Sequence, residues 1–182
     1  RIRHSRDVSF QNRGPRGQHS TSRRVVADVL STLAGLGLGI TLMLELAGLK
    51  LASFTSAGPL FTVLGRLTGM VGTYGMILTL FLIARIPLLE REVGFDRTVR
   101  WHRNLAPWSL LLIGLHVVFI VLGYAITEQT SVLRQSWALV TTTRWILPAV
   151  AGFLLLMVAG VTSYKRVRSR MSYETWWVTH IY

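Results

Sequence analysis

The sequence predicts an all-α integral membrane protein, a bundle of transmembrane helices, and three of its features support this class. Of the 182 residues, 51% are hydrophobic and only 15% are charged, whereas about a quarter of the residues in a soluble domain are charged. Four long apolar segments are each long enough to cross a bilayer as a helix. The basic residues gather in alternate connecting segments, as is typical of a multi-pass membrane protein.

The apolar segments define the expected spans in chain order. At about 1.5 Å of rise per residue, a helix needs roughly 20 residues to cross the hydrocarbon layer. Residues 28–49, 59–86, 103–126 and 145–164 meet this requirement. A further apolar segment starts near residue 174 and reaches residue 182 after a few positions. We therefore expect five visible spans, of which the fifth, residues 174–182, is incomplete.

The segment before the first span is polar and contains seven Arg. We expect residues 1–24 to form a basic, disordered cytoplasmic tail and residues 25–182 to form one transmembrane domain. The tail lacks the interleaved aromatic residues and the folded platform that nucleic-acid binding uses, so no nucleic-acid partner is predicted. His4 and His19 lie in this tail, and no ligand role is expected for either.

The positions of Lys and Arg predict the orientation. Sixteen lie in the N-terminal segment, between the second and third spans, or between the fourth and fifth spans, and only three lie in the other two loops. Because basic loops remain on the cytoplasmic side of the membrane, we expect a multi-pass protein of the plasma membrane with its N-terminus in the cytoplasm.

The third span carries two histidines, His102 and His116, fourteen residues apart. Fourteen residues of a helix end within about 40° of their starting direction and advance about 21 Å. The two imidazoles therefore face one side of the helix near opposite edges of the membrane, which suits two metal centres and electron transfer between them. The alternative is a hydrogen bond from each ring to a neighbouring helix, and Pro107 makes the angular register of His102 less certain.

A third histidine, His180, enters the membrane from the same side as His102, at the start of the fifth span. One imidazole on each of two helices at equal depth is what axial ligation of a haem iron requires, and such an iron carries electrons without an open site for substrate. Trp176 shares the helix face of His180, and Phe119 lies beside His116. Either aromatic residue packs on a haem or belongs to the ordinary core.

Three arginines are candidate partners for haem propionates. Arg100 and Arg103 flank His102 at the cytoplasmic edge. They either bind a propionate of an inner haem or only help to keep this loop on the cytoplasmic side. Arg66 lies within the second span, roughly 10 Å from its outer end, and Glu45 in the first span lies at a similar depth. An ion pair of Arg66 with Glu45 is one expectation, and contact of Arg66 with an outer propionate or an anionic acceptor is the other.

Four glycines of the second span share one helix face: Gly65, Gly69, Gly72 and Gly75. They predict either close packing against another helix or a smooth wall for a flat ring, and the sequence does not separate the two. The chain has no Cys. Thiolate ligation, iron–sulfur clusters and covalent attachment of a c-type haem are therefore excluded for these residues.

Two segments, LIARIPLLEREVGFDRTVRWHRNLAPWSLLLIGLH and MSYETWWVTHIY, resemble the ferric-reductase-like transmembrane domain that ferric reductases and NADPH oxidases share. The resemblance covers about residues 25–182 and is closest to bacterial, particularly actinobacterial, membrane flavin oxidoreductases. It implies a six-helix bundle with two b-type haems, an inner haem held by His102 and His180 and an outer haem with His116 as one ligand. The second outer ligand and the sixth helix would follow residue 182.

The resemblance also implies an oxidoreductase of the ferric reductase or NAD(P)H oxidase type in the bacterial inner membrane. Electrons from cytoplasmic NAD(P)H and FAD would cross the two haems to ferric iron or dioxygen outside. No Gly-rich dinucleotide motif occurs here, so the flavin domain is expected in another part of the protein or in another chain. Two alternatives remain open: a haem subunit that reduces a separate partner, such as a periplasmic reductase, and a non-redox transporter or scaffold.

Overall fold

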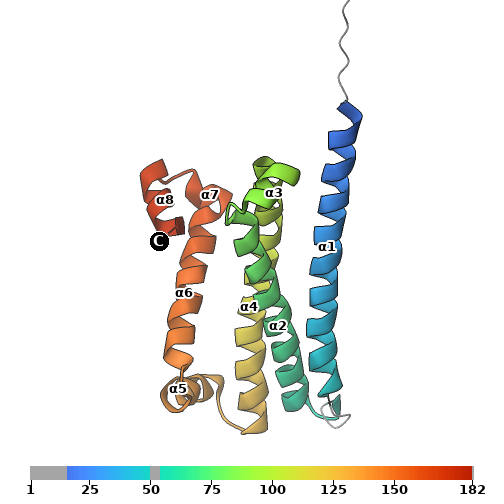
Figure 1. The fold of residues 1–182 in the computed structure, drawn as a ribbon. Helices are drawn as coiled ribbons and strands as arrows, with labels where there is room; N and C mark the ends of the chain where they lie inside the picture. Colours follow the sequence, from blue (N-terminus) through green and yellow to red (C-terminus); the bar gives the residue numbers. More distant parts are fainter. Residues whose placement is uncertain (1–15, 50–53, 182) are drawn as a thin grey trace, which may run out of the picture.

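The computed structural model describes residues 16–49 and 54–181, which form helices and no strand (Figure 1). Four helices are long and apolar enough to cross a membrane: α1 from Arg24, α2, α4 and α6. They correspond to the first four predicted spans, and α8 occupies the start of the predicted fifth. The helices of the described residues are α1 (Arg16–Ala47), α2 (Ala57–Ile83), α3 (Pro87–Glu92), α4 (Phe95–Thr127), α5 (Val132–Thr142), α6 (Ile146–Ser163), α7 (Lys165–Arg168) and α8 (Tyr173–Ile181).

The bundle has two distinct ends. The first residues of α1, together with α3, α7 and α8, lie at the upper end in Figure 1, and α5 lies across the lower end. The upper end carries the basic segments between α2 and α4 and between α6 and α8, and we call it the basic end. The tail predicted for residues 1–24 overlaps α1, which begins at Arg16; residues 1–15 lie outside the described part of the chain.

The most extensive contact between the described helices lies between α2 and α4, and the glycines of α2 make it possible. A Cβ atom placed on Gly65 would lie 2.8 Å from a side-chain carbon of Ile120, and one placed on Gly72 would lie 3.0 Å from the backbone nitrogen of Ile113. The same atom on Gly69 would collide with the ring of His116. The sequence predicted that the glycine face of α2 serves either close helix packing or contact with a flat ring, and the structure supports close helix packing.

Pro107 lies inside α4 without ending the helix, which runs unbroken from Phe95 to Thr127. Its ring removes one backbone donor, so the carbonyl of Arg103 loses its usual partner. Ser109, which is buried against α2, donates from Oγ to the carbonyl of Leu105 at 3.2 Å in the same turn. Because the helix is continuous, its fourteen-residue spacing places His102 and His116 at two depths of one helix.

A test of the α2–α4 contact compares two glycine variants. Gly72→Ala is expected to destabilise the protein by about 1–3 kcal/mol, because the new methyl group must displace the backbone of α4. Gly39→Ala is the matched control, since nothing lies within 4 Å of a Cβ at that position of α1. The control should be neutral or stabilising by up to about 1 kcal/mol. Equal unfolding temperatures of the two variants in detergent would contradict the packing role.

Candidate functional site

His102 of α4 and His180 of α8 face each other near the basic end of the bundle. Their ring centroids lie 6.5 Å apart and their ring planes are inclined by 87°. A bond from a metal ion to an imidazole nitrogen is about 2 Å long, so two imidazoles on opposite sides of one ion have centroids roughly 6 Å apart. The structure thus brings together the two histidines that the sequence paired, at a separation that fits an axial pair.

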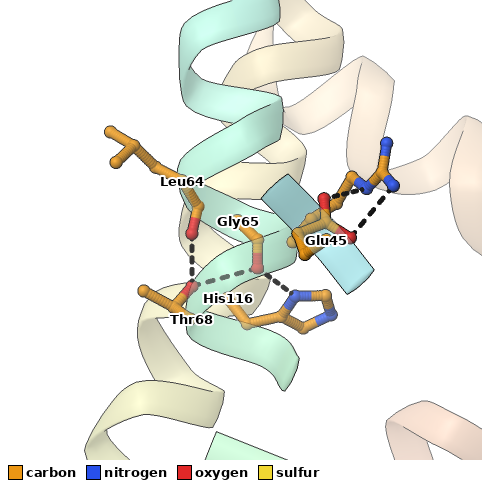
Figure 2. Close-up of polar contacts among 6 residues, drawn as sticks. Glu45, Leu64, Gly65, Thr68 and His116 are labelled. Atoms are coloured by element: carbon orange, nitrogen blue, oxygen red, sulfur yellow. Dashed lines mark hydrogen bonds and ion pairs between the residues drawn. The ribbon is translucent and has the colours of Figure 1, made fainter. Parts of the chain in front are cut away.

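The backbone of α2 orients the two histidines of α4. Nδ1 of His102 lies 3.1 Å from the carbonyl oxygen of Thr79. Nδ1 of His116 lies 2.7 Å from the carbonyl oxygen of Gly65 (Figure 2). A carbonyl oxygen can only accept, so each Nδ1 carries the proton and donates. In the neutral ring the lone pair is then on Nε2, where a metal ligand needs it.

These hydrogen bonds are compatible with both roles considered for a histidine within the membrane, a structural hydrogen bond and metal ligation. The alternative to ligation was a bond to a neighbouring helix, and the structure contains that bond for His102 and His116. It uses only Nδ1, however, and metal-bound histidines usually donate their other nitrogen to a carbonyl or carboxylate. The bonds therefore fix the rings and leave Nε2 available.

His180 is held differently, by a side chain of the preceding long helix. Its Nδ1 lies 2.7 Å from Oγ of Ser163, the last residue of α6. Its ring also stacks on that of Trp176, with centroids 5.0 Å apart and planes inclined by 13°. The guanidinium carbon of Arg168 lies 3.7 Å from the centroid of the Trp176 ring. Trp176 thus packs on the imidazole itself, whereas Phe119 packs on Phe61 of α2.

Arg66 forms the ion pair with Glu45 that their similar depth predicts. Nη2 of Arg66 donates to Oε2 of Glu45 at 3.0 Å, and Nε lies 2.8 Å from Oε1 (Figure 2). The Glu45 side chain is 6% exposed and that of Arg66 is 54% exposed. The pair borders a cavity of about 480 Å³ between α1 and α2 that also reaches His116. Arg66 therefore keeps part of its surface toward that cavity while its charge is compensated.

Arg100 and Arg103 lie on α4 near His102 with exposed side chains. Among the residues that the structure describes, no group of three or more His, Asp or Glu could hold a bare metal ion. Two imidazoles, such as those of His102 and His180, could hold an iron whose remaining ligands come from a porphyrin.

Two supporting residues, Ser163 and Arg168, were not singled out by the sequence. Ser163 contacts His180 and Arg168 contacts Trp176 only because the chain turns back between α6 and α8, and no local pattern marks such contacts. From the sequence, Arg168 counted only among the basic residues that set the orientation, because a Lys- and Arg-rich loop by itself indicates no more than its side of the membrane.

A comparison with protein families finds a match over most of the chain. The family model described as ferric reductase like transmembrane component matches residues 68–182, more than half of the chain. Searches of curated proteins and of solved structures find no match.

The ion pair gives a stability test. Glu45→Ala leaves Arg66 without its carboxylate and should destabilise the protein by about 2 kcal/mol. The double variant Glu45→Leu, Arg66→Met removes both charges and is expected to recover much of that loss, because an apolar pair leaves no uncompensated charge. Unfolding temperatures in detergent measure both. A double variant less stable than Glu45→Ala would show that the side chains stabilise the fold by something other than their pairing.

Proposed function

We propose that this chain, which belongs to the ferric reductase-like transmembrane component family, is the membrane portion of an oxidoreductase that carries electrons across a bilayer. The proposed donor is cytoplasmic NAD(P)H acting through FAD on a separate domain. The proposed acceptor lies outside the cytoplasm and is ferric iron or dioxygen. The proposed location is the bacterial inner membrane with the N-terminus in the cytoplasm, in agreement with the basic end of the bundle.

The proposed cofactors are two b-type haems, whose iron supplies one-electron reduction and reoxidation. His102 and His180 are the proposed axial ligands of the inner haem. His116 is a proposed ligand of the outer haem, with its second ligand further along the fifth span. The observation that carries the proposal is the pairing of His102 and His180 at 6.5 Å, with each Nδ1 at hydrogen-bond distance from an oxygen.

The surroundings of the imidazoles support a role in electron transfer. Rings fixed at Nδ1 cannot rotate freely, which keeps the iron ligands in place when the oxidation state changes. With His102 and His180 as its two ligands, an inner haem iron would have no open position for substrate and would serve only to carry electrons. We propose that Arg66 faces an outer propionate or an anionic acceptor from the cavity that it shares with His116.

The haem assignment is tested by optical spectra of the full-length protein in membranes. Reduction by dithionite should produce the bands of b-type haem, with two haems per chain. His116→Ala should remove the outer haem, about half of the signal, and keep the inner one. His19→Ala is the matched control and should leave both, because its residue lies in the segment for which no ligand role is expected.

Two results would contradict different parts of the proposal. A wild-type protein without haem would refute the function. A His116→Ala variant that retains two haems and the wild-type spectrum would refute the role of His116 alone.

A further inference from the structure

Trp176 has a buried donor without an acceptor. Its ring is half-buried at the basic end of the bundle, and its Nε1 atom is fully enclosed. Among the residues that the structure describes, none accepts a hydrogen bond from this nitrogen. A buried indole N–H normally has a partner, because leaving it unpaired costs about 1–3 kcal/mol. The free donor therefore points to an acceptor supplied by a bound group.

A positive charge lies beside this donor. The guanidinium of Arg168 stacks over the Trp176 ring, 3.7 Å from its centroid. The ion pair found among the described residues joins Arg66 to Glu45 and does not include Arg168. An N–H donor and an uncompensated guanidinium at one place form a site for an anion, and a carboxylate accepts from both.

The position of the ring relates this anion site to the imidazole pair. Trp176 lies within 13° of parallel to His180, the imidazole that faces His102. The free N–H donor therefore belongs to a ring stacked on the imidazole that would hold the inner haem, and the propionates of such a haem are carboxylates.

We propose that Trp176 and Arg168 form a carboxylate-binding subsite for the inner haem, in which Trp176 Nε1 donates to one propionate and Arg168 compensates its charge. This inference rests on the proposed function, because the carboxylate belongs to the group held by His102 and His180. It differs from the expectation that Arg100 and Arg103 take this role, since both side chains are exposed on α4.

The test uses the full-length protein with its haems and compares Trp176→Phe with Trp108→Phe. Trp176→Phe keeps an aromatic ring and removes only the donor, so the propionate becomes less well compensated and favours ferric iron. One of the two steps of a redox titration should shift to a lower midpoint potential. Infrared difference spectra between the two oxidation states should show altered carboxylate bands. Trp108 lies on α4 and is 67% exposed, and its variant should match the wild type in both measurements.

Arg168 gives a second, independent arm. Arg168→Gln should lower the same midpoint potential, and Arg168→Lys should restore most of it because the positive charge is kept. If Trp176→Phe does not fold, the midpoint potentials of these Arg168 variants test the carboxylate-binding subsite instead.

The outcomes separate this subsite from the function on which it rests. Unchanged potentials and carboxylate bands in Trp176→Phe and in Arg168→Gln, with two haems bound, would overturn the subsite. An equal shift in Trp108→Phe would overturn it as well. A wild-type protein without haem would instead defeat the proposed function.

Discussion

The close approach of α2 and α4 is the constraint on which the rest of the site depends. Lipid provides no hydrophobic force between helices, so close backbone contact must supply the packing energy. Glycines on α2 allow it, and a methyl group at Gly72 would already press on the backbone of α4. The same contact brings the carbonyls of Gly65 and Thr79 within hydrogen-bond distance of imidazoles on α4. The packing of α2 against α4 therefore also sets the orientation of the imidazole rings on α4.

This arrangement resolves a difficulty that a histidine meets inside a membrane. An imidazole N–H without an acceptor is costly in hydrocarbon, and helix carbonyls are already used within their own helix. A carbonyl oxygen has two lone pairs, so Gly65 can accept from His116 Nδ1, at 2.7 Å, in addition to the N–H donor of its own helix (Figure 2). The ring is then satisfied at one nitrogen and open at the other. A purely structural histidine and a metal ligand share this arrangement.

The sequence predicted the parts of this structure that depend on composition and depth. The spans follow from apolar length. The pairing of Glu45 with Arg66 was one of two expectations for Arg66, and the structure contains that pair. The glycine face was ambiguous, because absent side chains fit both a helix and a flat ring. Helix α5, eleven residues at the end opposite α8, is too short to register as a span. The contact of Arg168 with Trp176 depends on a turn between helices, which no local pattern encodes.

The two imidazoles of the site, His102 and His180, are held by their surroundings to different extents. This difference gives the haem of the proposed function a structural role. His102 is fixed by the backbone of α2, within the most extensive contact of the described helices. His180 is fixed by the Ser163 hydroxyl at the end of α6, a helix without any buried residue. A group that binds both imidazoles joins α4 to the α6–α8 unit. Because a ligand that binds only the folded state stabilises it, and does so more as its affinity rises, the haem would hold the bundle together as well as carry electrons through it.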